Sequence, residues 1–179
     1  MHTYISLLRG INVSGHNKIS MQELKKLYES LGFQNVRTYI QSGNVLFESS
    51  SANALALASM IEQKIKTFFG FNVHVFIKTP SELQAIIKNN PFTKEDVTKL
   101  HVTFLSDRFA SPLKDELDCV KDKTEKCLIS ENRVYLFCPN GYGKTKLTNT
   151  FFERKYKLSA TTRNWKTVTT LLELALRNI

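Results

Sequence analysis

The sequence predicts an α+β fold in which one order of elements, β-α-β-β-α-β, occurs twice in tandem. Two patterns support this prediction. Short apolar runs typical of strands alternate with longer stretches whose apolar residues recur every three or four positions, as in amphipathic helices. Clusters of Gly, Pro, Asn and Ser separate these stretches. The length of 179 residues and the apolar fraction of 42% are sufficient for a hydrophobic core.

The first half begins with an expected strand over residues 4–8. Ser20 and Glu23 have the spacing of a capping box and predict a helix that Gly32 ends. Strands over 36–40 and 45–47 form a hairpin; a second helix before Gly70 and a strand over 73–77 follow. This order is the ferredoxin-like split unit. The apolar faces expected for the two helices are Met21, Leu24, Leu27, Tyr28 and Leu31, and Leu55, Ala58, Ile61, Ile65 and Phe68.

A short linking helix is expected after Thr79 and Pro80, because threonine caps helices and proline suits the first helical position. It carries Leu83, Ile86 and Ile87 and ends before Pro91. The expected boundaries are residues 1–79 for the first half, 80–100 for the linking segment and 101–179 for the second half with its closing helix.

The second half repeats the pattern without a residue-level repeat. Its expected strands are residues 101–105, 127–130, 134–137 and 160–163. One helix is expected after Ser111 and Pro112 and another over residues 146–156. Asn164 is expected to cap the closing helix.

The formal charge of +9 is concentrated toward the C-terminus. Residues 132–179 contain nine Lys and Arg against two Glu, which gives nine minus two, or +7. A basic region of this kind indicates phosphates, nucleic acid or an acidic partner, and a merely solvated basic surface is the alternative. Without an apolar run of about 18 residues or a secretion signal, we expect a cytoplasmic protein with no membrane partner. Cys119, Cys127 and Cys138 lack C-x-x-C spacing, so reduced thiols are expected.

Two loops, residues 8–18 and 139–148, each combine glycines with cations between an expected strand and an expected helix. Glycines allow close backbone approach, and the first N–H groups of a helix favour anions. A true P-loop is excluded, because Cys138 stands where its first glycine is required. The alternatives are that the asparagines only shape the first loop and that the second is an ordinary turn. The candidate ligand-binding residues of these loops are Arg9, Asn12, Asn17, Lys18, Gly141, Gly143, Lys144, Lys146 and Thr148.

Two further places are candidates for the same ligand. Ser42 and Asn44 in the hairpin turn offer a hydroxyl and an amide, although a tight turn needs such residues in any case. Arg163, Asn164 and Trp165 place the only tryptophan beside an arginine, which suits stacking on a base of single-stranded nucleic acid or of a nucleotide. Burial of Trp165 against the closing helix is the alternative.

No catalytic residue is assigned from the sequence. The four histidines are far apart and match no metal-ligand spacing, and no G-x-S-x-G elbow occurs. Carboxylates are scarce near the loops, which weakens a magnesium-dependent mechanism. We therefore expect no metal and no cofactor, and whether the chain is an enzyme stays open.

Three motifs, residues 7–13, 36–45 and 160–168, resemble in this order the bacterial domain of unknown function family 1697. The resemblance spans residues 4 to about 174 and implies an autonomous cytoplasmic α/β protein without an established activity. One departure is Ser14, where members have a second glycine after Ile-Asn-Val. The motif positions carried over are Arg9, Gly10, Asn12, Asn17, Lys18, Gln41, Ser42, Gly43, Asn44, Asn140, Gly141, Gly143, Lys146, Leu147, Arg163, Asn164 and Trp165.

The sequence thus predicts a protein that binds a phosphate-bearing ligand, nucleic acid or nucleotide, through glycine-containing loops and basic residues. One alternative is an enzyme acting on a small phosphorylated or nucleotide substrate, with Arg9, Lys18 and Lys146 stabilising charge. Another is a protein-interaction module with a basic face. The sequence defines neither the ligand nor the oligomeric state.

Overall fold

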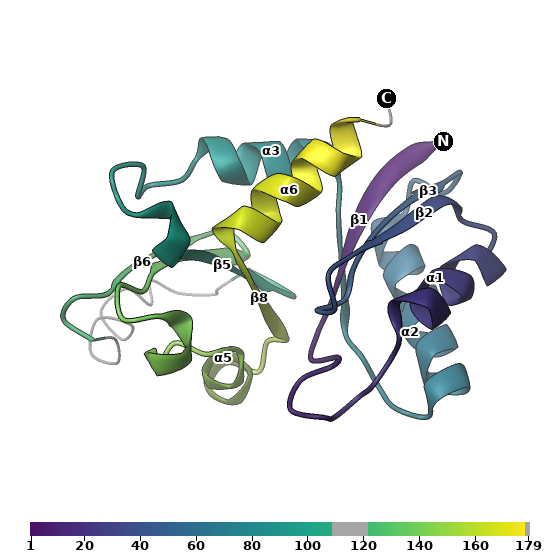
Figure 1. Cartoon of the computed structure of the whole chain (residues 1–179), viewed down its shortest axis with the longest axis horizontal. Helices are drawn as coiled ribbons and strands as arrows, with labels where there is room; N and C mark the ends of the chain where they lie inside the picture. Colours follow the sequence, from purple (N-terminus) through teal and green to yellow (C-terminus); the bar gives the residue numbers. More distant parts are fainter. Residues whose placement is uncertain (109–121, 178–179) are drawn as a thin grey trace. The chain divides into compact units, whose positions relative to one another are not determined.

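The computed structural model describes residues 1–108 and 122–177. The chain forms two compact units, Met1–Ala85 with Thr170–Ile179, and Ile86–Thr169 (Figure 1). The predicted α+β arrangement in two halves is confirmed. The boundaries at residues 79 and 100 stay predictions, and the helix expected after Ser111 and Pro112 lies outside the described residues.

The first unit contains an antiparallel sheet in the order β2-β3-β1-β4. The helices α1 and α2 lie on the same side of this sheet (Figure 1). The chain order is β1 (His2–Leu8), α1 (Met21–Ser30), β2 (Gln34–Tyr39), β3 (Asn44–Ser49), α2 (Ala54–Phe69) and β4 (Val75–Lys78), followed by α3 (Pro80–Lys88).

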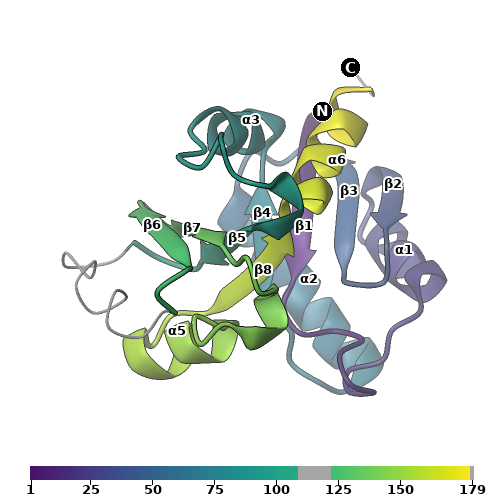
Figure 2. The same cartoon turned by 60° about the vertical axis from the view of Figure 1, so that its left-hand side comes forward.

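The second unit contains an antiparallel sheet in the order β6-β7-β5-β8, so corresponding strands occupy corresponding places in the two sheets (Figure 2). Its described elements are η1 (Val97–Lys99), β5 (Leu100–Leu105), β6 (Lys126–Ser130), β7 (Arg133–Phe137), η2 (Tyr142–Lys144), α5 (Asn149–Tyr156), β8 (Ala160–Asn164) and the start of α6 (Trp165–Leu176).

The C-terminal part of α6 belongs to the first unit. There the Arg37 side chain of β2 donates a hydrogen bond from Nη2 to the Leu174 carbonyl at 2.8 Å. A cation at the C-terminal end of a helix interacts favourably with its unpaired carbonyls. The first unit is therefore completed by residues from the far end of the sequence.

Helix starts follow the capping signals in the sequence. The Ser20 hydroxyl accepts from the Glu23 N–H at 3.1 Å, while the Glu23 carboxylate accepts from the Ser20 N–H at 3.2 Å, so the capping box is confirmed. The Asn164 side chain accepts from the Thr167 N–H at 2.8 Å and caps α6 as predicted. These caps satisfy N–H groups that a helix start leaves unpaired.

The apolar face predicted for α2 is partly wrong. Its buried residues are Leu57, Ile61 and Ile65, whereas Leu55 is 84% exposed and Phe68 is 64% exposed. Successive residues are about 100° apart around a helix, so Leu55 lies nearly opposite Leu57. Burial of Leu57 therefore turns Leu55 toward solvent.

The helix predicted over residues 146–156 begins three residues later. Thr148 is its N-cap, with the hydroxyl accepting from the Phe151 N–H at 3.2 Å, and α5 starts at Asn149. Residues Tyr142–Lys144 form the short helix η2 instead. The side-chain cap at Thr148 competes with continuation of the helix toward Lys146.

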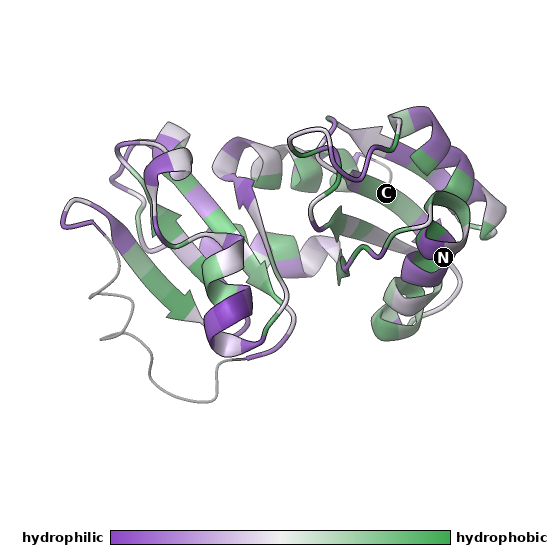
Figure 3. Cartoon of the chain, turned by 90° about the horizontal axis from the view of Figure 1, so that it is seen from below, coloured by the Kyte–Doolittle hydropathy of each residue, from purple (hydrophilic) through white to green (hydrophobic). Residues whose placement is uncertain are grey.

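The hydrophobic core of the first unit lies between the sheet and its two helices. Tyr28, Phe33 and Phe47 form an aromatic cluster there, with the Phe33 and Phe47 ring centroids 4.5 Å apart. The strands are coloured mostly as hydrophobic and the helices carry hydrophilic segments in Figure 3. Burial of this apolar surface is the main favourable contribution to folding.

Substitution of Gly43 by alanine is expected to lower the free energy of unfolding by about 3 kcal/mol, from left-handed backbone strain plus overpacking. Gly43 has φ +76°, and an added Cβ would lie 2.8 Å from Leu8 Cβ and Ile11 Cδ1. Gly15→Ala is the matched control, because Gly15 has φ +80° but its nearest contact would be 3.9 Å away. We expect a loss of about 1 kcal/mol for this control. Equal losses in urea unfolding of the two variants would refute the steric argument.

Candidate functional site

The loop after β1 interlocks with the β2–β3 turn in the first unit. Asn12 Nδ2 donates to the carbonyls of Ile19 and Gln41, each at 2.9 Å, and Asn12 Oδ1 accepts from the Ile19 N–H at 2.9 Å. The Leu8 N–H donates to the Gly43 carbonyl at 2.8 Å. Hydrogen bonds therefore join the sequence motifs over residues 7–13 and 36–45 in the first unit.

The other asparagines of this region also bond to the protein. Asn17 Nδ2 donates to the Gly10 carbonyl at 3.1 Å. Asn44 is fully buried, and its Nδ2 donates to the Tyr39 carbonyl and the Ser42 hydroxyl, each at 3.0 Å. These contacts show that the asparagines shape the loop and the turn, as the alternative to ligand binding expects. Ligand binding by these side chains stays a prediction.

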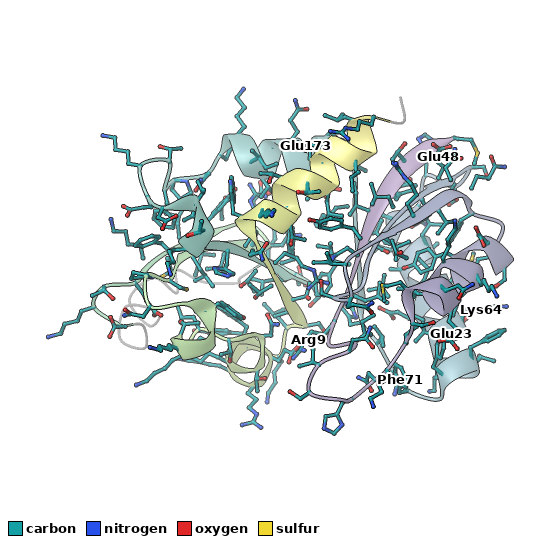
Figure 4. The ribbon with its side chains drawn as sticks, in the orientation of Figure 1. Arg9, Glu23, Glu48, Lys64, Phe71 and Glu173 are labelled. Carbon is teal, nitrogen blue, oxygen red and sulfur yellow. The ribbon has the colours of Figure 1, made fainter. Side chains whose placement is uncertain are left out.

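What the loop presents to solvent is mainly a cation beside a shallow depression. Lys18 is exposed, and Arg9 is half-buried at the base of the loop (Figure 4). The depression has a volume of about 480 Å³. It is lined by Asn12, Gly15, Lys18, Ile19, Ser20 and Gln41.

The loop over residues 139–148 in the second unit is anchored by buried polar contacts. Thr145 is 6% exposed, and its hydroxyl donates to the buried Glu125 carboxylate and accepts from the Leu147 N–H, each at 3.1 Å. The Glu125 carboxylate also accepts from the Asp122 N–H at 3.1 Å. Buried polar groups with satisfied hydrogen bonds fix a local conformation.

A second anchor of this loop is Tyr142. Its hydroxyl donates to the Thr162 hydroxyl at 3.0 Å, and its ring stacks on His101 with the centroids 5.0 Å apart. The Thr162 hydroxyl in turn donates to Asn149 Oδ1 at 2.7 Å. The loop is thereby tied to two strands and to the start of α5.

Lys144 and Lys146 extend from this anchored loop into solvent. Gly141, with φ +92°, and Gly143 lie in the same loop, and an added Cβ would meet nothing within 4 Å at either glycine. Since α5 begins only at Asn149, these lysines precede the helix and do not stand in its first turn. They are presented by a turn that the fold holds in place.

Thr148 leads from the loop to a second depression, on α5. Its volume is about 480 Å³, and Thr148, Thr150, Phe151, Arg154 and Lys155 line it. Lys155 Nζ lies 5.7 Å from the centre of the Phe151 ring, within cation–π range. Arg154, Lys155 and Phe151 were not predicted as site residues, although Phe151 and Lys155 have the four-residue spacing of helix neighbours.

The corner at Arg163, Asn164 and Trp165 is largely used by the protein itself. Arg163 is 7% exposed, and its Nη1 donates to the Thr161 hydroxyl at 2.8 Å and the Thr162 carbonyl at 3.0 Å. Asn164 caps α6. Trp165, the first residue of α6, is half-buried.

The candidate residues are divided between the two compact units. The first unit holds Arg9, Asn12, Asn17, Lys18, Ser42 and Asn44. The second unit holds Gly141, Gly143, Lys144, Lys146, Thr148, Arg163, Asn164 and Trp165.

Residues 1–108 and 122–177 contain no group of three or more His, Cys, Asp or Glu that could hold a metal ion. Within the same residues, no helix has the length and apolar character needed to span a membrane. Cys127 and Cys138 are free thiols, and burial raises the pKa of Cys138 to about 12.

His101 is expected to titrate below its ordinary value of 6.5. Burial lowers its pKa, and the contact of Nδ1 with the Lys99 carbonyl at 3.2 Å opposes the shift. The folded state thus disfavours the proton, so the stability that neutral His101 contributes is present above pH 6.5 and falls as the pH drops through the folded pKa. A proton NMR titration of the folded protein measures this pKa, and urea midpoints should fall less at low pH for His101→Gln than for the native chain. An NMR titration midpoint for His101 above pH 6.5 would contradict the prediction.

Among solved structures, the conserved bacterial protein SP0830 from Streptococcus pneumoniae is similar, with a TM-score of 0.68 at 24% identity. The match covers 97% of this chain and 98% of that chain, and at this identity it shows the fold alone. Comparison with curated proteins yields no match.

The family described as "Protein of unknown function (DUF1697)" matches residues 1–135. The matched range includes the interlocked motifs around Asn12 and Gly43, while the motif over residues 160–168 lies beyond it. Since the match covers well over half of the 179 residues, the chain belongs to this family.

Proposed function

We propose that the second unit binds a phosphate-bearing chain, a single-stranded nucleic acid, along the anchored loop and α5. The observation that carries this proposal is a group of exposed cations, none of which has an acidic partner within 4 Å in the described part of the chain. These cations are Lys144, Lys146, Arg154 and Lys157. Exposed cations without acidic partners attract phosphates, and their binding to a nucleic acid releases its counterions.

The distribution of the cations favours a chain over a compact ligand. They occur from the loop before α5 to Lys157 at its C-cap, and Arg154 lines the depression on that helix. A nucleic-acid strand can contact several separate cations with successive phosphates, and sequence-tolerant binding adds stacking of bases on aromatic rings. Phe151 and Tyr156 are half-buried beside Lys155 and supply ring surface of this kind.

The anchoring of the loop supports the same proposal. Glu125 and Tyr142 hold Lys144 and Lys146 on a backbone that needs little further ordering when a ligand arrives. A preorganised surface loses less conformational entropy on binding. Because Glu125 already accepts hydrogen bonds from Thr145 and Asp122, its contacts serve the loop and do not indicate a catalytic base.

We also infer that both units have the ferredoxin-like topology and that the protein works in the cytoplasm. The matching strand orders of the two sheets support the first inference. The free thiols Cys127 and Cys138 support the second, since cytoplasmic proteins keep thiols reduced. Helical NMR chemical shifts for residues 112–120 test the topology of the second unit, and extended shifts would refute it.

Binding is measured by fluorescence anisotropy of a labelled oligothymidylate and a labelled oligouridylate, each about 12 nucleotides long. The double variant Lys144→Gln, Lys146→Gln should weaken binding and reduce the slope of log K against log salt by about 1.4, since each phosphate contact of a single strand contributes about 0.7. Trp165 fluorescence gives an independent signal from the second unit.

The matched control is Lys25→Gln, Lys66→Gln, which removes the same charge from exposed positions of the first unit. It should leave the slope unchanged. Equal weakening by the two double variants would mean that only net charge matters, and the proposed surface would be wrong. If a mononucleotide competed as strongly as the oligomer, the ligand would be a small molecule and not a nucleic-acid chain.

A further inference from the structure

An apolar groove lies between α1 and α2 in the first unit. Its volume is about 370 Å³. Leu27 is buried in its wall, and Phe68 is 64% exposed. The complete lining is Glu23, Lys26, Leu27, Ser30, Phe68 and Phe69.

Exposed apolar surface continues from the groove along α2. Met60 is 43% exposed and lies two helical turns before Phe68, with Lys64 between them at the four-residue spacing of one helix face. Lys64 Nζ lies 5.0 Å from the centre of the Phe68 ring. From Met60 to Phe68 the stripe is about 12 Å long, at 1.5 Å per helical residue. A large exposed aromatic beside a groove marks a surface that gains free energy when a partner covers it.

The charges at the rim of the groove are predominantly positive. Lys26 lines it, and Lys64 stands over Phe68; Figure 4 labels Glu23 and Lys64 at the helices of this unit. The carboxylate of Glu23 accepts hydrogen bonds from the Ser20 hydroxyl and N–H, which lower its pKa, and the charge of Lys26 lowers it further. Lys25 faces Glu29 at 3.8 Å. Lys26 and Lys64 form no ion pair within 4 Å in the described residues, and these two cations stand against the single carboxylate of Glu23.

We propose that this groove docks an acidic amphipathic helix of a partner protein. The apolar stripe matches the two helical turns over which such a helix places residues at positions i, i+3, i+4 and i+7. Aspartate or glutamate beside those residues would face Lys26 and Lys64. The site lies in the first unit and is independent of the nucleic-acid surface proposed for the second.

The probe is a fluorescein-labelled peptide of about 14 residues, long enough for a helix to form on binding, with leucine at the four groove-facing positions and glutamate and alanine elsewhere. Anisotropy should show saturable binding to the full chain. Phe68→Ala should weaken it at least about tenfold, as for an aromatic anchor. Lys26→Gln and Lys64→Gln should each weaken it and reduce its salt dependence.

Leu55→Ala is the matched control, because Leu55 is an 84% exposed apolar residue on another side of α2. It should leave the affinity unchanged, and circular dichroism should show both alanine variants folded. Three results would overturn the proposal: no saturable binding, equal effects of Phe68→Ala and Leu55→Ala, or equal affinity for a peptide with lysine in place of glutamate. Binding of the chain to anionic phosphatidylglycerol vesicles that Phe68→Ala abolishes, without peptide binding, would also overturn it and assign the groove to lipid.

Discussion

A close backbone approach at Gly43 is the constraint on which the first unit depends. The end of β1, the loop that follows it and the turn between β2 and β3 meet at a point where no side chain fits. The Leu8–Gly43 hydrogen bond extends the β1–β3 pairing to this point, and Asn12 then ties the loop to the turn. The register of two central strands and the path of the loop are thus fixed by one glycine and one amide.

The second unit holds its own glycine-containing loop by different means. There the contacts are buried and polar: Thr145 with Glu125, and Tyr142 with Thr162. A backbone–backbone approach leaves no side chain to titrate, whereas this loop stacks on His101, whose pKa burial lowers. The two loops resemble each other in composition and both present exposed lysines, Lys18 in the first and Lys144 and Lys146 in the second, but different contacts hold them in place.

Local signals made much of the fold predictable. The capping box at Ser20, the cap at Asn164 and the hairpin turn predicted at residues 41–44 each depend on neighbours within a few positions. The structure has all three, with the turn one residue earlier, between Tyr39 and Asn44. Which face of α2 is buried was not predictable from spacing alone, because Leu55 and Leu57 both fit an apolar face. Glu125 was missed for another reason: its partner Thr145 lies 20 residues away, and no periodic pattern connects them. Asparagines in loops have the same ambiguity, since the residue type that binds ligands also closes turns.

The first unit includes residues that follow the second unit in the sequence, which limits the order in which the protein can fold during synthesis. Arg37 donates to the carbonyl of Leu174, a residue that leaves the ribosome after the whole of the second unit. The core between α1, α2 and their sheet can assemble early, but the Arg37–Leu174 hydrogen bond forms only after the second unit has been synthesised. A chain stopped after the second unit therefore carries an arginine whose acceptor has not been made.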